Sequence, residues 1–454
     1  MDGVGLMAGV AHVPGATVVA GMIRKGTLTA TEHVTEVLDA IDRTQSEFAS
    51  WAYVDREGAV VAAQRADALL HAGVRTGPLH GVAVGVKDVI AVAGMPTRAG
   101  SKSTSVRPCV RDAVAVERLR AAGAVIVGKT TTHEFASGQG DPGTVNPRFP
   151  DRYAGGSSVG SGVAVAVGSV PAALGTDTGG SIRNPAAVNG VVGFKPSRHF
   201  VDARGLLHFS RTLDVVGPIA PSVADCRLVA TALSGATREP PRSSRPVRLA
   251  VDRSIFDSPA LDDGFKVVLA DAIDRLVASG VEFVECRDPD FGHAMTAALV
   301  IGLTEFASNH VERLSHLGVD YLPETRHMVE TGLLLEATDL ALAERATGRI
   351  TRTLAELARS TGADALIGVT LPAPPPLIRE MSTALTAPVE RTSLSSALQH
   401  LSLANLTGLP AITVPAGEAL GQPVGLHLTG LNANDFRLLD VAEEIEEYFL
   451  GFTN

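Results

Sequence analysis

Apolar residues in the region 15–72 recur at the intervals of three and four that predict amphipathic helices. One such helix covers residues 29–44, where Thr29 or Thr31 is the candidate N-cap. Residues 57–73 show the same spacing and end at a glycine. This region therefore predicts helices that bury one side against the rest of the protein.

Short apolar runs then alternate with helical segments along the chain. Residues 81–90 alternate as a strand does, and residues 112–130 predict a helix, a glycine turn and a buried strand. Further strands are predicted at residues 247–254, 281–286, 411–417 and 423–430. Strands that alternate with helices indicate an α/β fold with a largely parallel sheet.

The second half of the chain is richer in predicted helix. Residues 261–282 predict an amphipathic helix, residues 290–362 are mainly helical, and residues 435–449 predict a further helix. Proline-rich stretches at residues 240–246 and 372–376 break this pattern, and the first is a candidate boundary. Length alone favours two or three domains, since a domain usually has about 100–200 residues.

The composition excludes several classes of protein. Of the 454 residues, 45% are hydrophobic, and the net charge of −10 comes without any basic block, so no nucleic-acid partner is expected. Residues 154–176 carry no charge, but their glycines, serines and Pro171 predict buried backbone rather than a membrane span. The first residues lack the basic segment of a signal peptide, and three scattered cysteines fit a reducing compartment. We therefore expect a cytoplasmic globular protein.

The histidines do not indicate a metal site. Thirteen are scattered along the chain, and none shows an HxH or HxxxH spacing. Metal-binding sequences usually cluster such ligands. We therefore expect neither a metal nor another cofactor.

Lysine is rare in this chain, which uses arginine as its usual cation. Only six of the 39 basic residues are lysines, and Lys87, Lys129 and Lys195 stand in apolar sequence. A desolvated lysine can lose its proton, whereas arginine stays charged. These three lysines are therefore candidates for a chemical role.

Two short motifs match known templates without the context that each template requires. GQGDPG, residues 138–143, matches the dinucleotide-binding pattern GxGxxG, but Pro142 stands where a helix should start, so a loop is favoured. GSSVG, residues 156–160, matches a nucleophile elbow with Ser158 as the nucleophile. An elbow needs a strand directly before it, and the preceding residues contain two prolines.

The stretch GTDTGGSIRN, residues 175–184, predicts a strand, a tight turn and the start of a helix. Such a turn displays Ser181, and the N–H groups of Thr178, Gly179 and Gly180 are suited to a developing oxyanion. From these residues alone, an anion-binding or purely structural turn is an equally good interpretation. No histidine lies near Ser181, so a nucleophilic serine here needs another proton acceptor.

A longer segment favours catalysis by resemblance. Residues 155–197, from GGSSVGSG to GFKPS, closely resemble the signature of the amidase signature family. Other parts of the chain resemble the family at residues 77–101, 127–138, 212–225 and 405–430. The resemblance implies an α/β fold with a large central mixed β-sheet surrounded by helices.

The resemblance also revises the domain organisation expected from length. It implies a single domain over residues 1–454, with N-terminal helices at about residues 15–72. It further implies a variable, mainly helical substrate-entrance region at about residues 290–362.

Members of this family are serine hydrolases with a Ser–cis-Ser–Lys triad. Matched motif by motif, the resemblance makes Ser181 the nucleophile, Ser157 the bridging serine after a cis peptide bond, and Lys87 the base. The proposed relay is chemically coherent, because burial among valines would lower the pKa of Lys87 toward neutrality. A neutral Lys87 would then accept the Ser181 proton through the Ser157 hydroxyl.

The remaining site residues are also implied by the resemblance. It places an oxyanion hole at the backbone N–H groups of Thr178, Gly179, Gly180 and Ser181. It assigns loop-bracing roles near the site to Asp177, Ser158 and Arg183, and structural roles to Lys129 and Lys195. It assigns the border of the substrate pocket to Glu134, Ser137 and Gln139.

The function implied is hydrolysis of the C–N bond of a small amide, with an aryl amide, carbamate or ester as related substrates. The expected partner is this small molecule, and the expected oligomeric state is a monomer or homodimer. Two alternatives stay open. One is the glutaminase-type subunit of a tRNA amidotransferase, and the other is a non-catalytic member of the family.

Overall fold

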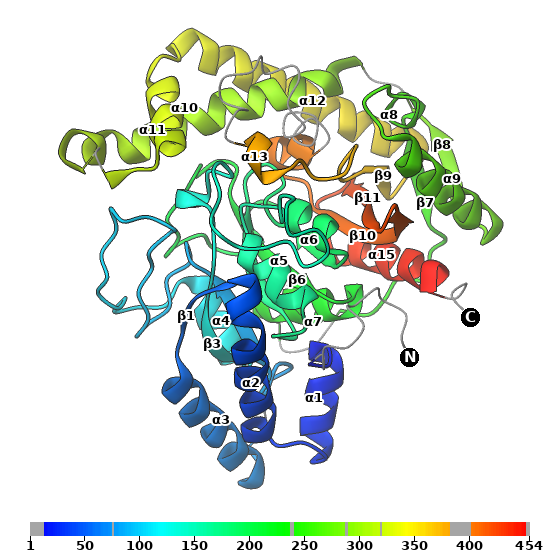
Figure 1. Cartoon of the computed structure of the whole chain (residues 1–454). Helices are drawn as coiled ribbons and strands as arrows, with labels where there is room; N and C mark the ends of the chain where they lie inside the picture. The colour runs from blue at the N-terminus through cyan, green and yellow to red at the C-terminus, as the bar shows by residue number, and fades with distance from the viewer. Residues whose placement is uncertain are drawn as a thin grey trace.

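The computed structural model of the chain describes residues 13–74, 77–236, 240–286, 289–317, 320–381 and 401–450. The segment on which the absence of a signal peptide was predicted lies mostly outside these residues. Within them, the fold is built on a single mixed sheet with helices around it (Figure 1). The predicted α/β class with a large central mixed sheet is confirmed.

Eleven strands form this sheet in the described part of the chain, in the order β1-β3-β2-β4-β6-β5-β10-β11-β9-β7-β8. Their bounds are β1 Trp51–Val54, β2 Ala83–Lys87, β3 Val125–Thr130, β4 Ala173–Asp177, β5 Val192–Lys195, β6 Val215–Ala220, β7 Arg248–Val251, β8 Glu282–Glu285, β9 Ala365–Val369, β10 Ala411–Ala419 and β11 Gln422–Gly430. Strand β2 runs parallel to both β3 and β4, whereas β4, β6, β5, β10, β11 and β9 pair antiparallel in succession. The sheet is therefore mixed rather than largely parallel.

The helices fall into three groups along the chain. The first half contains α1 Ala16–Lys25, α2 Ala30–Phe48, α3 Arg56–His71, α4 Val114–Ala121, the 3-10 turn η1 Glu134–Ala136, α5 Val159–Ala166, α6 Arg183–Asn189 and α7 Val223–Ser234. The middle contains α8 Arg253–Phe256, α9 Asp263–Ala278, η2 Pro289–His293, α10 Ala294–Leu317, α11 Pro323–Leu333 and α12 Ala337–Thr361. The last part contains α13 Ile378–Met381, a helical segment at residues 401–407, and α15 Asp435–Leu450.

Helices α5 and α6 cover the middle of the sheet. Helix α6 packs on β5, β10 and β11, and α5 packs on β2, β3 and β4. Helices α1 to α3 gather at one end of the molecule, and α10 to α12 gather at the opposite end (Figure 1). The predicted helical regions near residues 15–72 and 290–362 therefore lie on opposite sides of the central strands.

The helix that was predicted from residues 29–44 shows how local sequence sets an element boundary. Thr29 is the N-cap of α2, because its hydroxyl accepts the Glu32 N–H while the Glu32 carboxylate accepts the Thr29 N–H. Thr31, the other candidate, instead donates its hydroxyl to Asp67 on α3. The second threonine therefore joins two helices rather than capping one.

The strand predicted within residues 81–90 is confirmed as β2. All five residues of β2 are buried, because β3 and β4 flank the strand and helices cover it. The uncharged stretch 154–176 is buried throughout, as predicted, and contributes α5 and most of β4. Within the described ranges, no helix has both the length and the apolarity needed to cross a bilayer.

Candidate active site

Lys87 is the last residue of β2, and its side chain is fully buried. Its Nζ lies 2.8 Å from Ser157 Oγ and 2.8 Å from Thr176 Oγ1, which belongs to β4. The parallel pairing of β2 with β4 sets Val86 beside Leu174, so both strands end at the same edge. The sheet therefore brings Lys87 into contact with Ser157, for which a bridging role was predicted.

Burial changes the acid–base behaviour of Lys87. Loss of solvent lowers the pKa of its ammonium group to about 7, although the carboxylates of Asp214 and Asp177 oppose the shift. In the described part of the chain, no carboxylate forms an ion pair with Lys87; its contacts there are with hydroxyl and carbonyl oxygens. A large fraction of this lysine is consequently neutral near pH 7.

Ser157 is fully buried and follows a cis peptide bond with Gly156. Its carbonyl oxygen accepts hydrogen bonds from Thr132 Oγ1 at 3.1 Å and from the His133 N–H at 3.3 Å. Gly156 has no room for a side chain, since a Cβ would lie 2.3 Å from the Tyr153 hydroxyl. The glycine thus allows Ser157 to sit against the lysine while aromatic groups pack behind it.

Ser181 lies in the turn between β4 and α6, as the sequence predicted for this stretch. Its side chain is half-buried and faces a cavity, and its carbonyl oxygen accepts the Ser158 N–H at 3.2 Å. That hydrogen bond joins the two serine motifs. Gly180 has a φ of +123°, and a Cβ there would lie 2.4 Å from Leu401, so the turn needs glycine.

Asp177 and Arg183 form a buried ion pair beneath this turn, with Nη2 and Oδ1 2.9 Å apart. Burial alone would raise the pKa of Asp177, but the Arg183 guanidinium holds it well below its usual range. The sequence did not point to Asn405, which joins them by donating to Asp177 Oδ1 and accepting from Arg183. This network braces the turn that carries Ser181.

Ser158 is not placed as a nucleophile elbow. The residues just before it form no strand, and its hydroxyl exchanges hydrogen bonds with the backbone N–H and C=O of Thr176. Its side chain is fully buried. Ser158 therefore ties α5 to β4, and the GQGDPG stretch is a loop, as expected.

The backbone donors around Ser181 are not equivalent. The Gly180 N–H donates to Asp177 Oδ1 at 2.7 Å and is directed at this carboxylate. Within the described residues, the N–H groups of Thr178, Gly179 and Ser181 make no hydrogen bond. Donors for a developing oxyanion are therefore available at these three positions, and the Gly180 N–H serves the turn itself.

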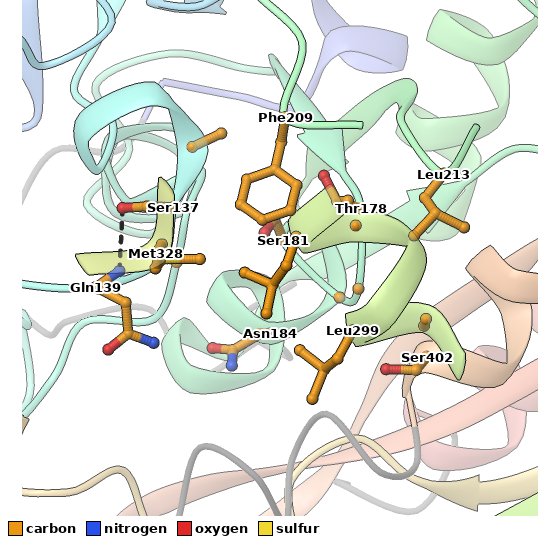
Figure 2. Close-up of a pocket in the computed structure, with 18 of the residues that line it drawn as sticks. Ser137, Gln139, Thr178, Ser181, Asn184, Phe209, Leu213, Leu299, Met328 and Ser402 are labelled. Carbon is orange, nitrogen blue, oxygen red and sulfur yellow. Dashed lines mark hydrogen bonds between the residues drawn. The ribbon is translucent and has the colours of Figure 1, made fainter. Parts of the chain in front are cut away.

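The cavity beside Ser181 has a volume of about 120 Å³. Its apolar lining comes from the loop between β5 and β6 and from helices α10 and α11: Phe209, Leu213, Ala298, Leu299, Leu303 and Met328. Figure 2 shows Ser137, Gln139 and Met328 on one side of the cavity and Leu299 and Ser402 on another. The described lining residues include no aspartate, glutamate, lysine, arginine or histidine.

Of the three residues predicted to border the substrate pocket, not all lie at the cavity. Ser137 and Gln139 line the cavity, but Glu134 does not. The buried Glu134 carboxylate accepts the Ser101 hydroxyl at 2.6 Å and the Leu322 N–H at 2.8 Å. Since Leu322 is the N-cap of α11, Glu134 attaches the start of α11 to the segment after β3.

Several lining residues were not predicted individually. Asn184 is the second residue of α6, the helix that follows the Ser181 turn. Tyr153 lies just before the GGSS motif. The residues from α10 and α11 had no local signal beyond their place in the predicted entrance region.

Comparison with known proteins shows the family of this chain. A family model described as amidase matches residues 32–439. A glutamyl-tRNA(Gln) amidotransferase subunit from Symbiobacterium thermophilum is 33% identical, over 92% of this chain and 93% of that protein. A crystal structure of an amidase is 31% identical with a TM-score of 0.85, covering 95% of this chain and 99% of that one. The native peptide amidase of Stenotrophomonas maltophilia is 26% identical with a TM-score of 0.77, covering 95% and 96%.

Proposed function

We propose, because this chain belongs to the amidase family, that it hydrolyses the C–N bond of small, uncharged amides through an acyl-enzyme on Ser181. The observation that carries the proposal is the cavity. Its described lining is mostly apolar and carries no charged side chain, and Ser181 opens onto it. Such a cavity favours an apolar acyl group, and an aryl or alkyl amide meets this requirement.

The proposed acylation begins with proton transfer away from Ser181. Ser157 accepts the Ser181 proton as its own proton passes to the neutral Lys87 amine, 2.8 Å away. The Ser181 oxygen then bonds to the substrate carbonyl carbon, and the negative charge moves to the carbonyl oxygen. The N–H groups available at Thr178, Gly179 and Ser181 are suited to stabilise this charge.

The remaining steps return the proton and release the products. As the C–N bond breaks, the leaving nitrogen receives a proton from Lys87 through Ser157, which leaves Ser181 esterified. Water then attacks the ester, the same relay removes its proton, and the carboxylic acid departs. Carbamates and esters fit this sequence, because they also place a carbonyl carbon next to a leaving heteroatom.

A second candidate is the glutamine-hydrolysing component of a tRNA amidotransferase. The observation in its favour is the similarity to the Symbiobacterium thermophilum protein along nearly the whole chain. Free glutamine, however, carries an ammonium and a carboxylate group that need charged or strongly polar partners when buried. The described lining residues offer no charged partner, which favours an uncharged amide.

A hydrolysis panel distinguishes the two candidates. Butyramide, butyranilide, a phenyl carbamate, a butyrate ester and glutamine would be offered to the purified chain alone. We expect kcat/KM for the apolar amides to exceed that for glutamine by about 100-fold or more, since burying unpaired charges is costly. Glutamine as the sole substrate, or activity only with partner proteins, would support the second candidate.

The matched control is Ser181→Ala, which removes only the proposed nucleophile. We expect kcat to fall by about 10⁴-fold or more. The unfolding temperature should stay unchanged, because the Ser181 hydroxyl faces the cavity and makes no hydrogen bond among the described residues. Substantial turnover by this variant, or labelling of it by a fluorophosphonate as in the wild type, would contradict the assignment.

A further inference from the structure

Phe209 is the member of a group of packed aromatic rings that lines the cavity beside Ser181. Its side chain is half-buried, and Figure 2 shows its ring among the side chains around the cavity, above Ser181 in the view. The ring of Phe306, which is fully buried, stacks on it with centroids 4.5 Å apart and 23° between the planes. Phe306 therefore covers one face of Phe209, and the part of the ring left uncovered borders the cavity.

Further buried rings hold Phe306 in place. The His310 ring centroid lies 4.4 Å from that of Phe306 and 4.5 Å from that of Phe135. Its Nδ1 also lies 2.8 Å from the Tyr321 hydroxyl oxygen, and all four residues are buried. Phe209 thus rests on a firmly packed support. A ligand that packs against a fixed ring loses little affinity to the ordering of that ring.

Gly302 leaves space beside the Phe209 ring. It lies on α10 one turn before Phe306 and lines the cavity. A Cβ at this position would lie 3.2 Å from Phe209 Cε1 and 3.7 Å from Leu213 Cδ1. Glycine is unfavourable inside a helix, so helix propensity does not account for this residue. Its lack of a side chain instead keeps one edge of the Phe209 ring open.

The size of the cavity and the chemistry of its wall indicate what binds there. The cavity has about 120 Å³, and a cavity of about 150 Å³ lined by Leu, Ile and Phe takes up benzene. The space is therefore close to that of one six-membered ring. Two aromatic rings in stacked or edge-to-face contact attract each other beyond the effect of the area they bury. An alkyl group of equal size buries a similar area without this gain.

We infer that Phe209 is a substrate-binding residue that packs against an aromatic ring bonded to the scissile amide, so that aryl amides are favoured over alkyl amides. This inference rests on the proposed amide hydrolysis and names its substrate class. The ring adjoins the reacting carbon, because Phe209 and Ser181 line the same small cavity. That volume holds one ring, on the acyl or on the amine side of the amide.

The test uses two pairs of substrates, each pair differing only in its ring. Benzamide and cyclohexanecarboxamide carry the ring on the acyl side, and butyranilide and N-cyclohexylbutyramide carry it on the amine side. The aryl-to-cyclohexyl ratio of kcat/KM is compared between the wild type and Phe209→Leu, which cancels the intrinsic reactivity of each substrate. We expect this ratio to fall by about 2- to 10-fold in one pair, which identifies the side on which the ring binds.

Phe200→Leu is the matched control. The Phe200 ring packs against Phe436 with centroids 6.1 Å apart, and it does not line the cavity. This variant should lower the unfolding temperature and leave the ratio unchanged in both pairs. A second variant, Gly302→Ala, keeps Phe209 and adds a methyl group beside its ring. There we expect kcat/KM for the aryl substrate to fall about fivefold or more relative to that for acetamide.

Two results would overturn the inference. One is an unchanged aryl-to-cyclohexyl ratio in both pairs for a folded Phe209→Leu variant. The other, which decides the matter if that variant does not fold, is an equal change for the aryl amide and acetamide in Gly302→Ala. Absence of hydrolysis of every amide by the wild type would instead show that the proposed function itself fails.

Discussion

The neighbouring strands β2 and β3 each bury a lysine, and the surroundings of these two lysines differ. Lys129 Nζ lies 2.8 Å from the carboxylate of Asp88 and also donates to Thr97 Oγ1. Lys87 Nζ instead contacts the hydroxyls of Ser157 and Thr176. Both side chains are completely shielded from solvent.

The partner of each lysine decides what that lysine can do. Burial lowers the pKa of both ammonium groups, but the Asp88 carboxylate opposes this shift at Lys129 through direct contact. The ion pair with Asp88 favours the charged form of Lys129 and joins β3 to the segment after β2. A lysine among hydroxyls can give up its proton near pH 7 and then accept one, as the proposed relay requires.

The largest expected effect is on catalysis at Lys87. In Lys87→Met, a side chain of similar length and no charge replaces the proposed base. We expect kcat for an anilide to fall by about 10²–10⁴-fold, the usual contribution of a general base. Stability should stay the same or increase, since no buried ammonium remains to be desolvated. Steady-state kinetics and thermal unfolding would be measured on the same preparation.

Lys129→Met should produce the reverse result. Removal of one partner leaves the Asp88 carboxylate buried and unpaired, which costs about 3–5 kcal/mol in the free energy of unfolding. The fraction that remains folded should keep a near-normal kcat. Urea denaturation measures the first effect, and active-site titration followed by kinetics measures the second.

A double variant checks the cause of that loss. Lys129→Met combined with Asp88→Asn removes the unpaired charge, so we expect it to regain part of the lost stability. If Lys129→Met instead stayed stable and lost kcat as Lys87→Met does, the distinction between the two lysines would be wrong.

The smallest expected effect is the change of kcat/KM with pH. Because protonated Lys87 cannot accept a proton, kcat/KM should rise about tenfold per pH unit below neutrality and level off above the pKa of about 7. Lys195 is the control, since burial also lowers its pKa to about 7, but its Nζ donates to Pro196 O away from the cavity. Lys195→Met should keep the acidic limb of the profile; a profile that became flat in this variant would assign the limb to the wrong lysine.

Local features of the fold were predictable because short-range geometry determines them. Thr29 and Glu32 form their capping box within one turn of helix, and the strand, turn and helix around Ser181 follow from residues 175–184. Gly156 and Gly180 stand where a side chain would collide with a neighbour, so their presence in the motifs has a steric cause. The likeness of residues 155–197 to the amidase signature likewise needed no tertiary information.

Burial of the central strands was less predictable. A strand with one solvated face alternates, but β2 has neighbours on both edges and helices over it, so all its residues are buried. The contacts of Glu134 could not be predicted either, because its partner Leu322 lies 188 residues away in the sequence. Sequence near Glu134 contains no trace of that contact.

The sequence by itself determined the family, the helices and strands with local signals, and the two serine motifs with their glycines. It marked three lysines as unusual but could not separate them by the contacts they make. Only the tertiary structure did so, by setting Lys87 against Ser157, 70 residues away, and Lys129 against Asp88. The reason is physical: caps and turns arise from atoms a few residues apart, whereas a side chain's partner, burial and pKa depend on which strands the sheet brings together.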